Sequence, residues 1–523
     1  MSITLKNYLG GKWIAGAGEG TALLDPVLGT ELARASAAGL DLASGYAFAR
    51  EQGGKGLRAM SYAERGKALR KLVDVFKTHR ARYLQISMEN SGTTAAHSSP
   101  DVDGAIFTLG YYARLATELG DARYLVDGEA TELDRDGSFI AQHVMVPSRG
   151  LALLINAFNF PAWGLWEKAA PALLSGVPVI AKPATATCWL TQAMVADAIE
   201  ANVLPKGALS VICGSGDGLL DALEPMDRLS FTGSAQTAAM LRAHPAVAAR
   251  SVRTNVEADS LNSVLLDPNV APGSDHFGQF AKEMARELSI KSGQRCTAPR
   301  RIFVPRENYE SCRDALCAAL GKITVGNPRN ENVRMGSLVS TAQKRDVLRG
   351  ISELREEAEL LFDGSRSALV DADPDISACV APYLLGINTG ARARETHELE
   401  VFGPVCTLIG YDNVEQAFEF IEAGQGSLVC SVYASNPEFG ARASLELAHV
   451  HGRLHVITPA VSTSHSGHGN VMPSSIHGGP GRAGGGEELG GLRGLQFYHQ
   501  RSAIQIESDG LGAITDNGKN YAP

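Results

Sequence analysis

The pattern of apolar and polar positions changes repeatedly between two periods in the region from about residue 150 to residue 257. Short apolar runs at 150–156, 177–183 and 207–213 are separated by longer stretches with helical spacing, such as 186–203. Strands that are apolar throughout and alternate with helices are typical of a parallel sheet covered on both faces. This region therefore predicts a doubly wound α/β domain, with its ligand beyond the carboxyl ends of the strands.

A second series of strands and helices runs from about residue 260 to residue 475. Its strand candidates are 301–305, 405–411, 428–435 and 453–457. Two sheet domains with a cleft between them are the simplest architecture for this order, and such clefts are common ligand sites. The charged helical segment 60–120 is expected to pack against the first sheet.

Length and composition agree with a globular protein of more than one domain. The chain has 523 residues, of which 44% are hydrophobic and 20% charged. Its formal charge of -9 is spread along the sequence and offers no patch for nucleic acid or an anionic membrane. The N-terminus lacks a signal-peptide pattern, and the longest uncharged stretch, 151–166, is shorter than the ~20 apolar residues of a membrane span. A cytoplasmic location is expected, with no nucleic-acid or membrane partner.

The eight cysteines show no repeating spacing. The close pair Cys312 and Cys317 lacks the C-x-x-C spacing of zinc or redox sites. His465 and His468 lie three residues apart in a Ser/Gly loop, without further ligands beside them. The sequence therefore predicts no metal site.

Cys296 has several basic neighbours in the segment 291–301 (KSGQRCTAPRR). Positive charges lower the pKa of a thiol, so this segment could favour a thiolate nucleophile. A buried or incidental cysteine is the more frequent explanation of such a segment taken alone. Glu257 ends the predicted strand 250–257 and Asn159 follows the strand of the first apolar run. A carboxylate and an amide there are candidates for a general base and an oxyanion donor.

Seven ordered landmarks make the chain resemble the aldehyde dehydrogenase superfamily over nearly its whole length. They are NYLGGKW at 7–13, FNFPAW at 158–163, AKPA at 181–184, FTGS at 231–234, GQRCT at 293–297, VFGPV at 401–405 and LQFYHQRSA at 495–503. The resemblance implies an α/β fold with a Rossmann-like doubly wound cofactor domain, an α/β catalytic domain and a small β oligomerisation element. In that order, the expected bounds are 1–137 with 153–256, then 257–480, then 138–152 with 493–523. A homodimer or larger homo-oligomer is expected.

The resemblance also implies a mechanism through a thioester. Cys296 would attack the aldehyde while Asn159 and the Cys296 backbone N–H stabilise the oxyanion of the thiohemiacetal. After hydride transfer to nicotinamide, Glu257 would activate water and release a free carboxylic acid, with protons relayed through Lys168.

Relatives have a third relay member, a glutamate from the glycine-rich C-terminal segment. Glu488 is the best match in this chain, and Glu487 is the adjacent choice. Gln496 is a further candidate because it is expected on a strand returning toward Glu257, although an amide cannot carry a proton as a carboxylate does. If that position faces Glu257, Gln496→Glu is expected to speed deacylation. Taken alone, a glycine run such as 477–494 is more often a flexible linker.

The usual dinucleotide fingerprint is missing. The segment CGSGDGLL has Gly214, Gly216 and Gly218 but Leu219 where G-x-G-x-x-G requires its third glycine. The resemblance instead implies that the pyrophosphate meets the N-terminus of the helix after Ser234. The residues expected to contact the cofactor are Ile155, Ala157, Phe158, Lys182, Ala184, Thr185, Gly216, Asp217, Thr232, Gly233, Ser234, Thr237, Glu400 and Phe402.

Thr185 bears on the choice of cofactor. Lys182 and the loop after it would meet the adenine ribose, and NAD-preferring relatives often carry a glutamate three residues beyond this lysine. A carboxylate would repel a 2′-phosphate, whereas threonine would not. We therefore expect NADP to be preferred, with NAD as a weaker substitute.

One pattern departs from most of the superfamily. Glu257 is followed by Ala258, Asp259 and Ser260, where relatives have a hydrophobic residue and two glycines. Together with 477–494, this variation resembles the branch that oxidises coenzyme A-linked semialdehydes in the degradation of phenylacetate and benzoate. The expected substrate is such a compound, for example 3,4-dehydroadipyl-CoA semialdehyde, and the fused hydratase domain of that branch is not expected here.

Two other functions remain open from the sequence. A coenzyme A-acylating aldehyde dehydrogenase would pass the thioester to coenzyme A, and a water-activating Glu257 disfavours it. A cysteine hydrolase or thioesterase would not need the nucleotide landmarks at Lys182, 231–234 and Glu400. Absorbance of reduced nicotinamide separates an oxidoreductase from a hydrolase.

Overall fold

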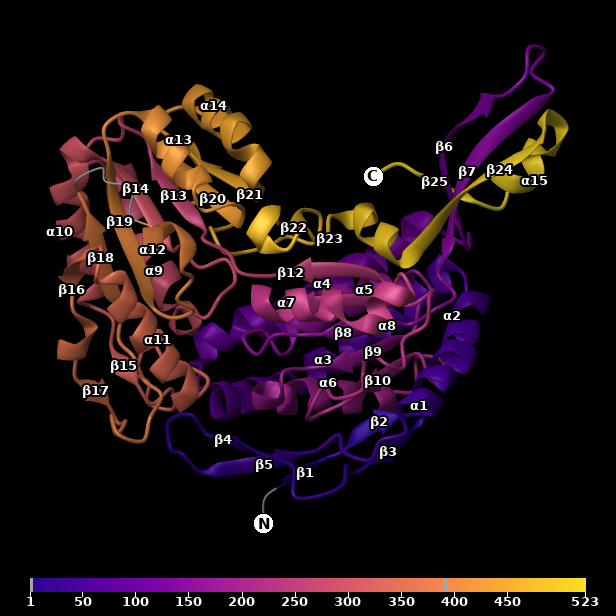
Figure 1. Ribbon diagram of the computed structural model, residues 1–523, viewed down its shortest axis with the longest axis horizontal. Helices are drawn as coiled ribbons and strands as arrows, with labels where there is room; N and C mark the ends of the chain where they lie inside the picture. The colour runs from indigo at the N-terminus through magenta and orange to yellow at the C-terminus, as the bar shows by residue number, and fades with distance from the viewer. Residues whose placement is uncertain (1–2, 389–393) are drawn as a thin grey trace.

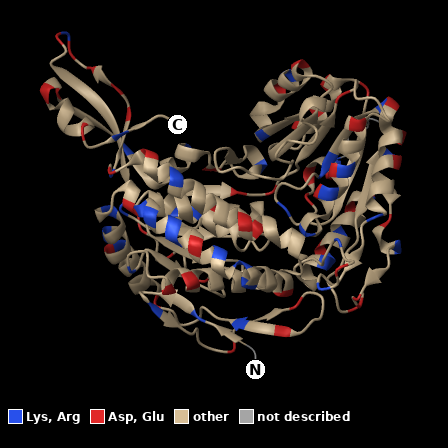
Figure 2. Ribbon diagram, turned by 180° about the vertical axis from the view of Figure 1, so that it is seen from behind, with Lys and Arg blue, Asp and Glu red and all other residues tan. Residues whose placement is uncertain are grey.

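Two lobes, each a sheet with helices around it, make up most of the molecule, and a slender β arm extends from the first lobe (Figure 1). The computed structural model describes residues 3–388 and 394–523, so 389–393 of the predicted catalytic domain lie outside the described residues. Among the residues described, no helix has the length and apolar character to cross a membrane. Acidic and basic residues are scattered along the ribbon of both lobes (Figure 2).

The sheet of the first lobe has seven strands. In spatial order they are β12 (Arg253–Glu257), β11 (Arg228–Thr232), β8 (Ala152–Ile155), β9 (Val179–Lys182), β10 (Leu209–Val211), β2 (Asn7–Leu9) and β3 (Lys12–Ile14). The five strands from β12 to β10 are parallel, as predicted, and β2 joins them antiparallel. After β10 the chain returns to the other side of β8, so the ends of β8 and β11 flank the topological switch point, where such sheets bind ligands.

Both faces of this sheet are buried, which explains its continuous apolar runs. Ala152 and Leu154 face one core, whereas Leu151 and Leu153 face another. The helices of the first core are α3 (Tyr62–Ser91), α4 (Ala95–Leu119), α5 (Trp163–Leu174) and α6 (Cys188–Glu200). The second core is covered by α1 (Leu42–Phe48) and α8 (Pro245–Ala249), with α7 (Ala235–Ala243) beside them. The segment 60–120 thus packs against the first sheet, as expected.

The second lobe is also built on a seven-stranded sheet. Its order is β16 (Glu359–Phe362), β18 (Tyr383–Ile387), β19 (Val405–Tyr411), β14 (Arg301–Pro305), β13 (Ser263–Leu266), β20 (Ser427–Tyr433) and β21 (His451–Ile457). All pairs are parallel except β16 with β18. The helices packed on it are α9 (Asp275–Ser289), α10 (Tyr309–Leu320), α11 (Thr341–Leu354), α13 (Val414–Glu422) and α14 (Pro437–Leu447). The four predicted strands are all present.

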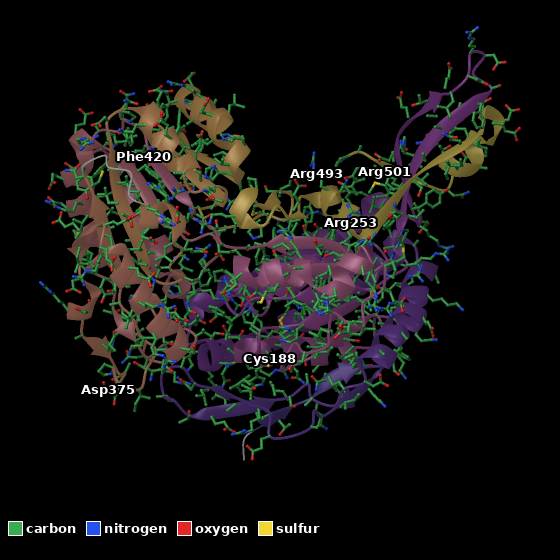
Figure 3. The ribbon with its side chains drawn as sticks, in the orientation of Figure 1. Cys188, Arg253, Asp375, Phe420, Arg493 and Arg501 are labelled. Carbon is green, nitrogen blue, oxygen red and sulfur yellow. The ribbon has the colours of Figure 1, made fainter. Side chains whose placement is uncertain are left out.

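The arm is a four-stranded sheet in the order β24 (His499–Glu507), β7 (Phe139–Pro147), β6 (Leu125–Glu132) and β25 (Lys519–Tyr521). It begins earlier than the predicted bound at residue 138, because β6 already pairs with β7. Arg253, Arg493 and Arg501 lie near the base of the arm (Figure 3). Arg501 Nε contacts Asp127 Oδ2 at 2.5 Å and so ties β24 to β6.

The glycine-rich segment is an ordered hairpin between the lobes. Strands β22 (Ile476–Gly478) and β23 (Glu487–Leu489) pair antiparallel, with His477 opposite Glu488. The general expectation of a flexible linker is wrong for this run, because the glycines allow close backbone contacts. A Cβ added at Gly484 would lie 2.4 Å from the Val256 carbonyl oxygen.

Candidate active site

Cys296 lies in a constrained loop between α9 and β14. The backbone is left-handed at three successive residues, Lys291, Ser292 and Gly293, with φ of 51°, 56° and 69°. The Asn262 side-chain amide donates to the Cys296 carbonyl oxygen at 2.6 Å. Strained backbone of this kind persists only where surrounding contacts fix it and is common at functional sites. The loop therefore holds the thiol in one place.

A thiol, an imidazole and a carboxylate meet at this loop. Cys296 Sγ lies 4.0 Å from His477 Nε2, and the same nitrogen lies 3.0 Å from Glu257 Oε2. Glu257 is the last residue of β12, and His477 is in β22. The ring of Trp163, on α5, lies 5.4 Å from that of His477. The sequence analysis predicted Glu257 and Cys296 as site residues but did not predict His477. The feature of the sequence that could have pointed to His477 is its position at the start of the glycine run.

The surroundings of Cys296 favour the neutral thiol. Burial and the nearby Glu257 carboxylate raise the thiol pKa well above its ordinary value. The predicted thiolate is therefore wrong for the resting site. Arg295 Nη1 contacts Glu287 at 2.6 Å, and Arg300 Nε contacts Glu400 at 3.4 Å. Both cations therefore form ion pairs with carboxylates and do not pair with the Cys296 sulfur. Cys296 needs a base before it can act as a nucleophile.

Glu257 is held as a carboxylate in spite of its burial. Burial alone raises the pKa of a carboxyl group, but His477 and Lys168 more than offset this and lower the Glu257 pKa to about 2. Its Oε1 atom accepts no hydrogen bond of normal geometry from the described residues, although the Cys296 thiol lies beside the carboxylate. Glu257 can therefore accept a proton at neutral pH.

Lys168 forms ion pairs with two carboxylates, and its charge also acts on Glu257. Lys168 Nζ contacts Glu488 Oε2 at 2.7 Å and also forms an ion pair with Glu167. Burial lowers the pKa of the Lys168 ammonium, but the carboxylates of Glu167, Glu488 and Glu257 raise this pKa by more than burial lowers it. Lys168 therefore remains charged. Glu488 Oε1 in turn accepts from Ser230 Oγ at 2.9 Å. Glu167 was missed by sequence reasoning.

Of the three C-terminal candidates, only Glu488 contacts Lys168 among the described residues. Glu487 is exposed and lies on the other face of β23. The expectation that Gln496 lies on a strand is wrong, because a short helix from Gly491 to Tyr498 precedes β24. No hydrogen bond joins Gln496 to Lys168, Glu257 or Glu488 in the described part of the chain, so the reason for Gln496→Glu is removed.

Two cavities, each of about 520 Å³, meet at Cys296. The first is lined mainly by apolar groups, including Phe107, Phe160, Trp163 and Met472, together with His477. The second also contains Asn159 and Glu257, so the predicted oxyanion donor, base and nucleophile share one space.

The second cavity lies at the switch point of the first sheet and collects most of the predicted cofactor residues. Those lining it are Ile155, Ala157, Phe158, Ala184, Thr232, Gly233, Ser234, Thr237, Glu400 and Phe402. Sequence reasoning missed Asn156, Phe231, Asp259 and Gln343, which also line it. Both polar atoms of the Asn156 side chain and Thr232 Oγ1 are buried without a hydrogen-bond partner among the described residues. Such atoms suit a polar ligand.

The remaining predicted cofactor residues, Lys182, Thr185, Gly216 and Asp217, do not line this cavity. Lys182 Nζ donates to the Pro183 carbonyl oxygen at 2.9 Å, and burial lowers its pKa. Thr185 Oγ1 donates to the Gly214 carbonyl oxygen at 2.8 Å, which places the loops after β9 and β10 side by side.

One carboxylate lies at the predicted phosphate position, and a second lines the same cavity. Asp259 Oδ1 accepts from the Ala235 backbone N–H at 2.9 Å, at the start of α7. Glu400 Oε2 accepts from the Ser260 backbone N–H at 2.9 Å. Burial, with a contribution from Asp259, raises the Glu400 pKa to about 7.

A model of the aldehyde dehydrogenase family matches residues 13–504. The chain belongs to this family. It is 50% identical over 477 residues to 3,4-dehydroadipyl-CoA semialdehyde dehydrogenase from Aromatoleum evansii, covering 91% of this chain and 93% of that protein. The predicted superfamily and branch are confirmed, and the chain is an aldehyde dehydrogenase.

Solved structures confirm the predicted α/β fold of this aldehyde dehydrogenase. The NAD⁺ complex of an aldehyde dehydrogenase from Bacillus cereus has a TM-score of 0.83 at 21% identity and covers 97% of both chains. Lactaldehyde dehydrogenase from Escherichia coli has a TM-score of 0.84 at 21% identity, covering 97% of this chain and 100% of that one.

Proposed function

We propose that this aldehyde dehydrogenase oxidises a coenzyme A-linked semialdehyde, such as 3,4-dehydroadipyl-CoA semialdehyde, to the free acid and prefers NADP to NAD. The observation that carries the proposal is the position of Cys296 where two cavities meet, one of which lies at the switch point and contains most of the predicted cofactor residues. The 50% identity to a protein named for that substrate supports the substrate class.

Acylation begins with the neutral Cys296 thiol. The aldehyde occupies the first cavity, and Sγ forms a bond to its carbonyl carbon as the thiol proton moves to Glu257 or His477, the nearest bases. The Asn159 amide and the Cys296 backbone N–H donate to the resulting oxyanion. Loss of hydride from the same carbon leaves a thioester on Cys296.

The second cavity fits a nicotinamide dinucleotide, since it combines aromatic walls with unpaired buried polar atoms. When bound, the nicotinamide accepts the hydride. Glu400 and Phe402 would hold its ribose and ring, and Asn156 and Thr232 offer polar atoms to the ligand. The absence of a carboxylate at Thr185 supports NADP, because no charge there opposes a 2′-phosphate.

Deacylation then requires an activated water. Glu257 accepts a proton from water as the water oxygen attacks the thioester carbon. The C–S bond then breaks, the Cys296 sulfur takes up a proton to restore the thiol, and the free acid is released. His477 and Lys168 keep Glu257 ionised. The buried Lys168 and Glu488 pair offers a path for the proton away from Glu257.

We also propose that the first lobe binds the cofactor, the second lobe supplies Cys296 and the arm forms a homodimer or larger homo-oligomer. A cytoplasmic location is supported by the cysteines, all eight of which lie in the described ranges and are free thiols.

The substrate and cofactor are tested with one semialdehyde, prepared both free and as its coenzyme A thioester. The expected kcat/KM is higher for the thioester and higher with NADP than with NAD, with a free acid as product. Equal kcat/KM for both forms would contradict the substrate, and a clear NAD preference would contradict the cofactor. A new thioester formed when free coenzyme A is added would favour the acylating alternative.

A further inference from the structure

The junction of the two cavities brings together nitrogen, sulfur and oxygen donors. One ligand atom from each of Cys296, His477 and Glu257 lies within 4.8 Å of the others. They come from a loop of the second lobe, the hairpin strand β22 and the end of β12, so the fold itself assembles the set. No sequence spacing shows it, since the three residues are far apart in the chain.

The separations between the ligand atoms are close to those around a tetrahedral metal. Zinc bonds of about 2.0–2.3 Å place two ligand atoms roughly 3.3–3.8 Å apart. The sulfur to nitrogen distance is 4.0 Å and the nitrogen to oxygen distance is 3.0 Å, so small side-chain movements bring both into range. A mixed set of thiol, imidazole and carboxylate suits Zn²⁺ and does not suit Mg²⁺ or Ca²⁺, which prefer oxygen.

We propose that Cys296, His477 and Glu257 form a binding site for Zn²⁺, which inhibits the enzyme by occupying the nucleophile. The Cys296 S–H bond breaks as the Zn–S bond forms, and the proton is released to solvent. The fourth position of the ion faces the cavity and is taken by water. The ion has no part in aldehyde oxidation, and the site goes beyond the proposed function.

Two observations besides the distances support this site. Glu257 Oε1 is buried without a normal hydrogen bond from the described residues, so it is free to bind a cation. The Lys168 ammonium, which would repel a cation, is itself paired with Glu488 and Glu167. The local charge therefore permits a divalent ion.

Metal-free enzyme titrated with Zn²⁺ in a calorimeter tests the site directly. We expect one strongly bound Zn²⁺ per chain, protection of Cys296 from alkylation, and no such effect of Mg²⁺. With Co²⁺ in place of zinc, a thiolate-to-cobalt charge-transfer band in the near ultraviolet is expected, which reports sulfur coordination independently of activity.

Variants locate the ligands. His477→Phe keeps a ring in place but removes the nitrogen and is expected to weaken Zn²⁺ binding by at least about tenfold. Cys296→Ser should abolish the cobalt band. Cys317→Ser, which removes a thiol far from the site, is the matched control and should change neither. Unchanged binding in His477→Phe, a cobalt band that persists in Cys296→Ser, or alkylation of wild-type Cys296 at an undiminished rate would each overturn the proposal.

Discussion

The His477 imidazole lies beside the Glu257 carboxylate and the Cys296 thiol, the two groups that exchange protons in the proposed reaction. Because it lies 3.0 Å from Glu257 and 4.0 Å from Cys296, it affects both the carboxylate and the thiol. His477→Phe is expected to lower kcat by about 10²-fold, within the usual range for a residue that assists proton transfer, with a smaller change in KM. Steady-state kinetics across pH 6–9 measures this.

A conservative variant separates this role from packing. His477→Gln retains a group that can hydrogen-bond Glu257, so it should recover part of the lost kcat but not the wild-type pH profile. Equal losses in both variants with an unchanged pH profile would show that His477 only fills space.

The raised pKa of Glu400 leads us to expect that cofactor binding depends on pH. Burial raises its pKa to about 7, so the carboxylate is protonated below that pH and charged above it. A charged carboxylate accepts hydrogen bonds from a ribose more strongly. The Kd for NADPH should therefore fall several-fold from pH 6 to pH 8, as measured by fluorescence titration. In Glu400→Gln this change should be much smaller, and an identical pH dependence in that variant would contradict the assignment.

The sequence allowed the reacting residues to be predicted, but not their electrostatics. These residues could be predicted from their positions relative to the family landmarks. The structure places Cys296, Glu257 and Asn159 in one cavity. It also brings Lys168 into contact with Glu488. His477 was missed because no periodicity marks a residue at the start of a glycine run. The protonation of Cys296 was predicted incorrectly, since basic neighbours in sequence point toward Glu287 and Glu400 in space.

At the scale of elements, the β22–β23 hairpin carries one residue beside Cys296 and one residue of the proposed proton relay. His477 and Glu488 face each other across its two strands. An added Cβ at Gly486 would lie 2.4 Å from the Val256 carbonyl oxygen on β12. Gly486→Ala should push the hairpin away from β12, shift both residues and lower kcat by about tenfold or more, as measured by steady-state kinetics and thermal unfolding.

The adjacent glycine provides a control. A Cβ at Gly485 would meet no atom within 4 Å, although its φ of 71° disfavours alanine. Gly485→Ala is expected to lower the free energy of unfolding by about 1 kcal/mol and to leave kcat close to wild type. If both variants had the same kcat, hairpin placement would not control the site.

Long buried strands were predicted better than short elements. The apolar runs predicted some of the strands in each sheet, because continuous burial leaves a clear pattern, but they did not predict β2, β3, β13, β16 or β18. Short elements such as β22 and the helix containing Gln496 depend on tertiary contacts, which local sequence does not record.

At the scale of the whole molecule, the arm predicts self-association. Strand β24 is at the edge of its sheet and pairs with β7 over nine residues, and Phe139 and Val146 on β7 are exposed. Long edge strands and exposed apolar groups are suited to pairing with another chain. Light scattering after gel filtration should give at least twice the 55.3 kDa of one chain.

Matched substitutions test the surface. Phe139→Lys with Val146→Lys should reduce the mass toward that of one chain, whereas Leu445→Lys, at a still more exposed apolar residue of α14, should not. A monomeric wild-type protein at micromolar concentration would contradict the proposed role of the arm.

The central claim is that Cys296 carries a thioester which Glu257 hydrolyses. The most direct measurement mixes Glu257→Gln with NADP and a coenzyme A-linked semialdehyde that the wild type oxidises, and follows reduced nicotinamide and the mass of the Cys296 peptide together. Because His477 remains to accept the thiol proton, we predict a burst of about one equivalent per chain, an acyl group on the Cys296 peptide, and turnover about 10²–10⁴-fold slower than wild type. Full turnover without an acyl group on Cys296 would contradict the account.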